Sequence, residues 1–201
     1  MLSARFDEAL VFASNLHVRQ VRKGSNIPYL SHLLSVTALV LENDGDEDEA
    51  IAALLHDAVE DQGGDATRQA IRRRFGEKVV TIVNGCTDAD TLPKPPWHER
   101  KQRYIEHLAS ASPSILLVSA ADKLHNARSL LRDYEVVGEQ LWLRFRTGKE
   151  GVLWYYRSLI ATYNTYYPTP LTAELTRTFR ELETLIASTP YNLSAGITET
   201  N

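Results

Sequence analysis

The chain has 201 residues, of which 43% are hydrophobic and 24% are charged, with 10 glycines and 8 prolines. These values are typical of a globular protein and exclude a collagenous, low-complexity or wholly disordered chain. The length favours one domain and allows at most two. The formal net charge of −4 provides no global attraction to nucleic acid or to an anionic membrane.

The sequence lacks the signals of secretion and of membrane insertion. The single cysteine, Cys86, cannot form an internal disulfide, and the first residues lack the basic start, apolar run and cleavage site of a signal peptide. No apolar run reaches the ~18 residues that a membrane span requires. We therefore expect a cytoplasmic protein with no membrane partner, in which Cys86 is an inert buried thiol.

Apolar residues recur at intervals of three and four almost throughout, and this spacing predicts an all-α protein. In chain order, the expected helices cover about residues 3–20, from 29 or 30 to 42, 47–61, 66–75, 77–86, 97–109, 113–131, 150–166 and 171–188. Prolines make residues 91–96 the clearest internal loop. No linker separates two cores, so we expect one domain over residues 1–188 and a flexible tail over 189–201.

The helix expected at 47–61 ends in an unusual polar group. It carries His56, Asp57, Glu60 and Asp61 within an otherwise apolar segment. A spacing of four residues places His56 above Glu60 and Asp57 above Asp61, so one face presents metal ligands and acid–base groups. The simpler interpretation is the charged end of an amphipathic helix. However, acids at a helix C-terminus oppose the helix dipole, and a bound cation would remove that conflict.

Two more candidate ligands stand on other expected helices. His32 lies near a helix start, and Asp122 lies within the apolar segment that begins near residue 113. Together with His56 and Asp57 they make two imidazoles and two carboxylates, a set that suits Mn²⁺, Fe²⁺ or Zn²⁺ better than Ca²⁺. Such a set leaves positions open for water and substrate. A P-loop is absent from the sequence, which argues against kinase-type use of ATP.

Four stretches resemble the HD-superfamily metal phosphohydrolases, and within them the small alarmone hydrolases and the hydrolase domain of RelA/SpoT proteins. These stretches are residues 22–32, 56–61, 97–104 and 121–128. In order and spacing they extend over about residues 6–167. The resemblance implies a single HD-type helical bundle, and 201 residues leave no room for the RelA/SpoT synthetase and regulatory regions.

The resemblance also implies roles for individual residues. The metal, usually Mn²⁺, would be bound by His32, His56, Asp57 and Asp122. The attacking water would be handled by Glu60 and Asp61, with Glu60 moving its proton. The substrate would be contacted by Arg22 at the base, by Lys23 near a phosphate, and by Asn126 and Arg128 at the ribose and phosphate.

The implied reaction is removal of the 3′-pyrophosphate of (p)ppGpp or (p)ppApp, and the sequence does not rank the two bases. Two alternatives stay open: a nucleotidase or general nucleotide phosphohydrolase, and a nucleotide sensor without catalysis. Glu60 and Asp61 beside a complete ligand set favour catalysis, because a binding protein needs no acid to activate water. The expected partner is a small nucleotide, without nucleic acid.

Several other residues have simpler interpretations. His17 lies on an apolar stripe, where a packed and hydrogen-bonded role is more common than metal binding. Aromatic residues at helical spacing, such as those at 154–156, are more often core than substrate contacts. Three histidines are left outside the expected metal site: His98, His107 and His125.

Overall fold

The computed structural model describes residues 1–89 and 93–188. Over these residues the chain is helical and has no β-strand, apart from an isolated bridge between Val21 and Pro28. The all-α prediction is therefore confirmed. Part of the expected loop at 91–96, and the tail at 189–201, lie outside the described residues.

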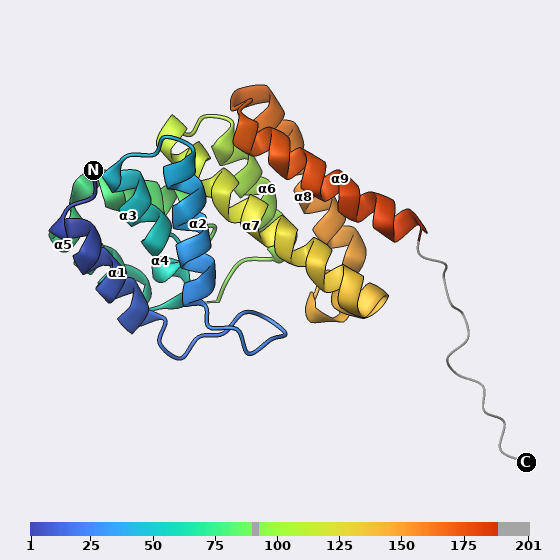
Figure 1. Cartoon of the computed structure of the whole chain (residues 1–201), viewed down its shortest axis with the longest axis horizontal. Helices are drawn as coiled ribbons and strands as arrows, with labels where there is room; N and C mark the ends of the chain where they lie inside the picture. Colours follow the sequence, from blue (N-terminus) through green and yellow to red (C-terminus); the bar gives the residue numbers. More distant parts are fainter. Residues whose placement is uncertain (90–92, 189–201) are drawn as a thin grey trace, which may run out of the picture.

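The helices follow one another in Figure 1 from the blue N-terminus to the red α9. Their bounds are α1 (Ala4–Leu16), α2 (Leu30–Glu42), α3 (Glu47–Leu55), α4 (Ala58–Asp61), α5 (Gly64–Cys86), α6 (Trp97–Leu108), α7 (Pro113–Val137), the 3₁₀ helix η1 (Gly138–Arg144), α8 (Gly148–Tyr166) and α9 (Pro170–Ser188). No helix of the described residues is long and apolar enough to cross a membrane.

Helix α7 lies at the centre of the bundle. It packs against α2, α3, α5 and α9, and Figure 1 shows it crossing the middle of the molecule. Every residue from Ile115 to Asp122 is buried. Each large aliphatic side chain that leaves water in such a core contributes about 1.5–3 kcal/mol to stability. Polar groups on α2, α3 and α7 that face one another are therefore held on a rigid support.

The helix expected over 47–61 is interrupted at its most polar point. Helix α3 ends at Leu55, His56 and Asp57 form a turn, and the single-turn α4 begins at Ala58. The expectation of one continuous helix is wrong, because periodicity counts apolar residues and does not detect a local change of direction. Asp57 thus precedes the N-terminus of α4 and does not oppose the dipole of a long helix.

The break expected between the helices at 66–75 and 77–86 is present in the structure. Helix α5 covers both 66–75 and 77–86 and is kinked at Gly76, which has φ 90° and ψ 176°. Side chains other than glycine rarely adopt that conformation. The two expected helices are therefore confirmed as separate helical segments, which meet at Gly76 within α5.

The segment between α1 and α2 forms a tight loop that carries Arg22 and Lys23. The Arg22 N–H donates to the Ile27 carbonyl at 2.8 Å, and the Tyr29 N–H donates to the Gln20 carbonyl at 2.9 Å. These bonds close the loop directly before α2, and they place its two cations beside the start of the helix that carries His32.

Candidate metal centre and nucleotide pocket

Four expected metal ligands meet in the interior. His32 on α2 and His56 after α3 direct their Nε2 atoms toward the carboxylates of Asp57 and Asp122. The His56 Nε2 atom lies 3.0 Å from Asp57 Oδ2 and 3.6 Å from Asp122 Oδ1. The His32 Nε2 atom lies 3.2 Å from Asp122 Oδ1 and 3.7 Å from Asp57 Oδ2. The structure thus brings together four residues that lie on distant segments of the sequence.

Hydrogen bonds on the far side of each imidazole orient its Nε2 atom inward. His56 Nδ1 lies 2.8 Å from the Ala53 carbonyl, so Nδ1 carries the proton and donates it. His32 Nδ1 lies 2.7 Å from Nδ1 of His125. Metal-binding histidines typically use the second ring nitrogen in this way. Both imidazoles can therefore present the Nε2 lone pair to a cation.

The electrostatic environment of His56, Asp57 and Asp122 also favours a bound cation. Burial alone would lower the pKa of His56, but Asp57 and Asp122 raise it well above its usual value. Burial would raise the pKa of Asp57, yet His56 and His32 hold it well below the usual range. The pKa of Asp122 is likewise low, because Lys123 and the histidines outweigh its burial. Positive charge is thus favoured between two ionised carboxylates.

The residues fit a divalent transition metal. Both Nε2 atoms are buried and have no hydrogen-bond partner among the described residues. Ligands about 2.1 Å from a metal lie about 3.0–3.5 Å from one another in octahedral or tetrahedral geometry. The N···O distances of 3.0–3.7 Å are close to those values. The donor set can hold one metal ion, which would supply a Lewis acid and lower the pKa of bound water.

Removing that metal should destabilise the fold. A ligand present at 100 times its dissociation constant stabilises a protein by about 2.7 kcal/mol, which for this chain length corresponds to about 5–10 °C in melting temperature. We expect a chelator to produce that decrease in the wild type, measured by calorimetry, and none in His56→Ala. An identical transition with and without chelator in the wild type would contradict a structural contribution of the metal.

Glu60 and Asp61 lie on α4, directly after the ligand turn. Glu60 is 22% exposed and accepts a hydrogen bond from Lys94 Nζ at 2.7 Å. Burial and the carboxylate of Asp88 raise the pKa of Glu60, and Lys94 offsets part of that effect. Asp61 accepts from Gln20 Nε2 at 2.8 Å. Both acids therefore lie close in sequence to two of the candidate ligands, His56 and Asp57, and neither belongs to the candidate ligand set.

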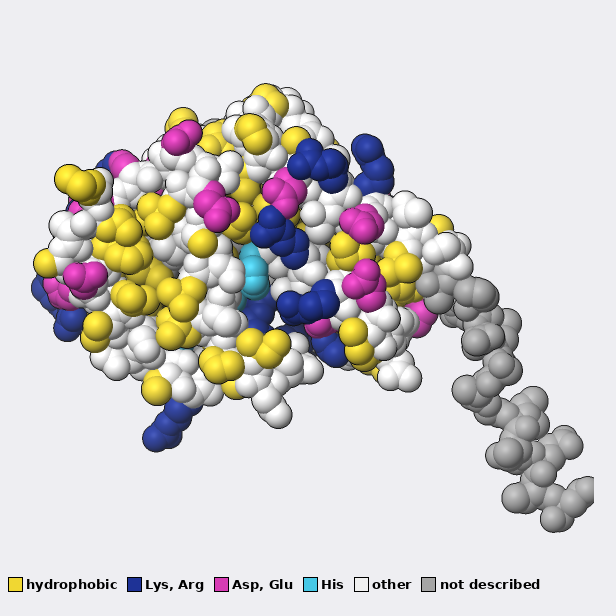
Figure 2. Space-filling view, viewed as in Figure 1, with side chains coloured by type: hydrophobic (Ala, Val, Ile, Leu, Met, Phe, Trp, Pro, Cys, Tyr) yellow, Lys and Arg dark blue, Asp and Glu magenta, His cyan; other side chains and the backbone are white. Residues whose placement is uncertain are grey.

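A cavity of about 530 Å³ opens next to the metal group. Figure 2 shows a histidine in a hollow of the surface, flanked by lysine and arginine side chains. Four residues of the cavity wall each contact a metal ligand. Tyr29 donates to Asp57, His125 contacts His32, and Lys123 and Asn126 bind Asp122. A molecule bound in the cavity would therefore adjoin the metal.

The cavity is strongly cationic although the chain is acidic overall. Its wall contains a single carboxylate, Asp133, among the described residues. The cations of the wall are Arg22, Lys23, Lys101, Lys123, Arg132, Arg144 and Arg146. Aromatic rings border the same space, including Tyr155 and Tyr156. An anion with a planar, apolar part matches this combination of charge and rings.

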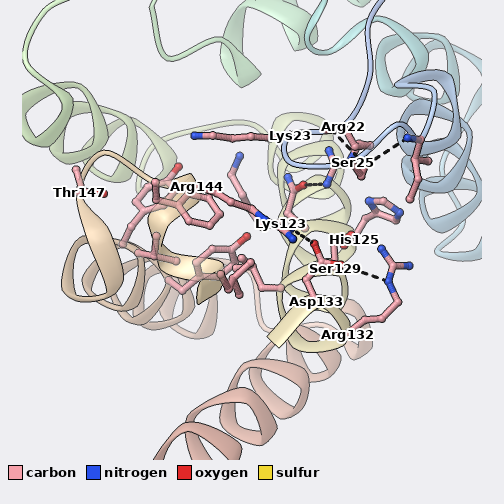
Figure 3. Close-up of a pocket in the computed structure, with 18 of the residues that line it drawn as sticks. Arg22, Lys23, Ser25, Lys123, His125, Ser129, Arg132, Asp133, Arg144 and Thr147 are labelled. Atoms are coloured by element: carbon pink, nitrogen blue, oxygen red, sulfur yellow. Dashed lines mark hydrogen bonds and ion pairs between the residues drawn. The ribbon is translucent and has the colours of Figure 1, made fainter. Parts of the chain in front are cut away.

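Three of the four expected substrate residues line this cavity. Arg22 donates from Nη2 to Asn126 Oδ1 at 2.7 Å and lies 5.7 Å from the ring centre of Tyr29. Lys23 Nζ lies 4.9 Å from the ring centre of Phe145. Figure 3 shows Arg22 and Lys23 on the loop that faces α7 across the cavity. Arg22, Lys23 and Asn126 are thus available to a ligand.

Arg128 does not line the cavity. It stands six positions after Asp122, which turns its side chain about 120° away from that residue around the helix. There it forms an ion pair with Glu174 of α9. The expectation that Arg128 contacts substrate came from its place in the motif, and the helical rotation separates it from the pocket.

Other residues of the site were not identified from the sequence. His125 was left outside the metal site, and it contacts His32 without facing the ligand group. Burial, with further contributions from His32 and Arg22, lowers the pKa of His125 to about 4, so a neutral ring can accept the proton of His32 Nδ1. Lys123 also lines the cavity, and its position next to Asp122 could have identified it from the sequence. No sequence pattern pointed to Arg144, which lies in η1 and outside the matched motifs.

The residues with simpler interpretations are also placed. His17 is buried, and its Nδ1 atom lies 2.7 Å from Gln20 Oε1, as a packed histidine requires. Burial raises the pKa of the Cys86 thiol, which disfavours the reactive thiolate. Tyr155 and Tyr156 are buried core residues that also border the cavity.

Comparison with known proteins identifies the family of this chain. Residues 9–152 match the HD domain family. Guanosine-3′,5′-bis(diphosphate) 3′-pyrophosphohydrolase MESH1 of Xenopus tropicalis is 42% identical over 128 residues, which cover 62% of this chain and 69% of the relative. The Homo sapiens protein of the same name is 39% identical over 133 residues, or 65% of this chain and 72% of the relative.

A solved structure has the same fold. It is described as a metazoan orthologue of SpoT that hydrolyses ppGpp and plays a role in starvation responses. It superposes with a TM-score of 0.74 at 29% identity, over 90% of this chain and 97% of the other. The chain belongs to the HD domain family of hydrolases, and its similarity to alarmone hydrolases extends over most of its length.

Proposed function

We propose that this protein is a metal-dependent hydrolase that removes the 3′-pyrophosphate of (p)ppGpp or (p)ppApp. The observation that carries the proposal is the group of two buried histidines, buried Asp122 and partly buried Asp57 beside a cationic cavity. Relatives at about 40% identity that bear the name of this activity support it. Mn²⁺ is the metal we propose, since a mixed nitrogen and oxygen donor set suits it.

In this proposal the cavity holds the nucleoside and the metal group holds the 3′-pyrophosphate. Arg22 lies near the Tyr29 ring and can contact the base, while Lys23 can approach a phosphate. Asn126 joins the two parts, because it accepts from Arg22 and donates to Asp122. The scissile phosphorus would therefore lie at the end of the cavity formed by Tyr29, Lys123 and His125.

Glu60 supplies the base of the proposed reaction. It takes a proton from the attacking water, and Asp61 helps to orient that water. The position of Glu60 one turn beyond His56–Asp57 supports this role, because its carboxylate can reach the water without being a ligand. Burial also raises the pKa of Glu60, and a base with a raised pKa accepts protons more readily near neutral pH.

The test is a nucleotide screen with purified, Mn²⁺-loaded protein in which phosphate and pyrophosphate are measured separately. We expect pyrophosphate from the guanine or adenine alarmone, together with the corresponding 5′-phosphorylated nucleotide. Orthophosphate from ordinary mononucleotides, without pyrophosphate from either alarmone, would instead establish a nucleotidase. Tight binding of alarmones without turnover would establish a sensor.

Replacing Arg22 should weaken turnover much more than replacing Arg128. Loss of a charged hydrogen bond costs about 1.5–3 kcal/mol, so we expect kcat/KM of Arg22→Ala to fall roughly 10- to 150-fold. Arg128→Ala removes the same charge from outside the cavity and should change kcat/KM less than about threefold. Equal losses in the two variants, in steady-state kinetics with alarmone, would contradict the placement of the nucleotide.

A further inference from the structure

Asp61, the acid that orients the water in the proposed reaction, stands at the end of a very short helix. Helix α4 has a single turn, Ala58–Asp61, and one turn forms too few internal hydrogen bonds to be stable alone. Asp61 is also exposed. An exposed carboxylate at the end of one turn can occupy several rotamers, so a fixed direction toward the water requires a contact from outside α4.

That contact comes from Gln20, in the segment that follows α1. The Gln20 amide donates from Nε2 to Asp61 Oδ2 at 2.8 Å, and among the described residues no other side chain donates to this carboxylate. The Oε1 atom of Gln20 accepts from Gln62 Nε2 at 2.6 Å. Gln20 thus forms complementary hydrogen bonds with two consecutive residues, and Figure 1 shows α4 near the end of α1.

His17 fixes the direction in which the Gln20 amide is turned. His17 Nδ1 lies 2.7 Å from Gln20 Oε1. Because an amide oxygen only accepts, Nδ1 carries the proton and donates it. With His17 and Gln62 both donating to Oε1, the amide nitrogen of Gln20 must point to Asp61. A reversed amide would place its N–H groups against two donors.

His17 is a rigid support for this arrangement. It is 2% exposed, and its ring stacks on that of Tyr29 with the ring centres 5.4 Å apart and an angle of 19° between the planes. The hydroxyl of Tyr29 donates to Asp57. The Gln20 side chain is therefore held by a buried ring that packs next to the metal group.

We propose that Gln20 is a positioning residue: held by His17 and Gln62, it fixes the Asp61 carboxylate in the direction that orients the attacking water. This inference rests on the proposed function and assigns a role to residues outside the cavity and outside the candidate ligand set. Gln20 touches neither nucleotide nor metal, and it acts through Asp61. Its loss should therefore lower kcat and leave metal content and KM unchanged.

Two substitutions of Gln20 separate its hydrogen bond from its packing. Both keep the main-chain bonds of this residue, which donates to the His17 carbonyl and accepts from the Tyr29 N–H. Gln20→Ala should lower kcat about tenfold, as expected for the loss of a hydrogen bond to a charged group. Gln20→Glu keeps the size of the side chain and the acceptor for His17 and Gln62, but it places a carboxylate oxygen against Asp61. It should lower kcat at least as far, whereas a role in packing would make it the milder substitution.

Two further variants serve as a control and as a test of the support. Gln102→Ala is the matched control, because Gln102 also donates its amide to a carboxylate, that of Glu106, at 2.8 Å. Both residues are exposed on α6 and lie outside the cavity, so kcat should stay within about twofold. His17→Phe keeps a ring against Tyr29 and removes the donor to Gln20. It should lower kcat about two- to tenfold, as the loss of a neutral hydrogen bond does.

The deciding kinetic experiment is a double-mutant cycle with Asp61→Ala. Because Gln20 acts through Asp61, Gln20→Ala should lower kcat about tenfold in the wild-type background and less than about twofold in the Asp61→Ala background. Equal losses in the two backgrounds would overturn the proposal, as would a loss in metal content or a rise in KM without a change in kcat. The cycle uses whichever nucleotide the wild type cleaves, so a substrate other than an alarmone would contradict the alarmone assignment and still test Gln20.

Crystal structures of the wild type and the variants test the contact without any turnover. We expect a single Asp61 rotamer in the wild type and in Gln102→Ala, and a different rotamer, or several, in Gln20→Ala. If the wild type cleaves no nucleotide and Asp61 still moves in Gln20→Ala, the hydrolase assignment fails and the positioning contact stands. An unchanged Asp61 carboxylate in Gln20→Ala would overturn the role of Gln20, whether or not the protein is a hydrolase.

Discussion

Glu60→Gln should lower kcat by about 10²–10⁴-fold while metal and nucleotide still bind. Glutamine keeps the size of the side chain and can still accept from Lys94, but it cannot take up the proton of the attacking water. Single-turnover rates, metal content and nucleotide affinity should be measured on one preparation. Glu135→Gln is the matched control, because Glu135 is exposed on α7 and lies outside the cavity.

The pH dependence gives a second measure of the same role. Burial and Asp88 raise the pKa of Glu60, so this carboxylate takes up a proton at a higher pH than an ordinary glutamate. As the pH is lowered, the wild-type rate should therefore begin to fall at a pH above the usual pKa of glutamate. The rate of Glu60→Gln should not show this decrease. An undiminished rate in the variant would remove Glu60 from the chemistry, and loss of bound metal would make it a ligand.

Asp122→Asn should abolish metal binding and lower kcat/KM by more than about 10³-fold. A metal ion contributes several kcal/mol to stabilising transition-state charge, and 4 kcal/mol corresponds to about 10³-fold in rate. Asparagine keeps the shape of the side chain but loses the negative charge that pairs with Lys123. Elemental analysis and pyrophosphate release are the two measurements.

A second variant of a candidate ligand distinguishes loss of the metal from loss of the fold. Breaking a buried ion pair costs about 3–5 kcal/mol, and Lys123 would keep its charge next to the new asparagine. His56→Ala leaves the Asp122–Lys123 pair intact and should lose metal and activity alike. Wild-type metal occupancy with full activity in a folded His56→Ala or Asp122→Asn protein would contradict the ligand assignment.

The sequence was sufficient to select candidate metal ligands that the structure brings close together, because polar groups stand where the surrounding sequence is apolar. A histidine and three carboxylates stand directly after the apolar residues 50–55, and Asp122 follows the apolar run from 115. Burying such groups is costly without a compensating partner. The structure shows each conflict resolved in the same place, between α2, the α3–α4 turn and α7.

The geometry of the pocket could not be predicted in the same way. Arg128 and Asn126 share one motif, yet a rotation of 200° for two residues separates them, and Arg128 binds Glu174. The break after Leu55 also escaped prediction, because apolar residues continue through Ala58 and Val59 and no glycine or proline occurs in residues 47–61.

The part of the cavity wall that contains Lys23, Asp133 and Arg144 depends on contacts between distant segments. Gly24 and Arg144 are 120 positions apart, and nothing local indicates that one side chain passes under the other. The 3₁₀ helix η1 is short and lacks a clear apolar period, so sequence patterns did not predict it. Only the assembled fold brings Lys23, Asp133 and Arg144 to one wall.

The most direct test of the metal-dependent reaction is a titration of metal-free protein with Mn²⁺, in which pyrophosphate release from ppGpp is followed in the same sample. His32, His56 and Asp57 could hold one ion, and Asp122 Oδ1 lies 3.2 Å from His32 Nε2. We therefore predict a rate that rises linearly to one equivalent of metal and then stays constant. Full pyrophosphate release by the metal-free protein, or orthophosphate as the product at one equivalent, would contradict the account.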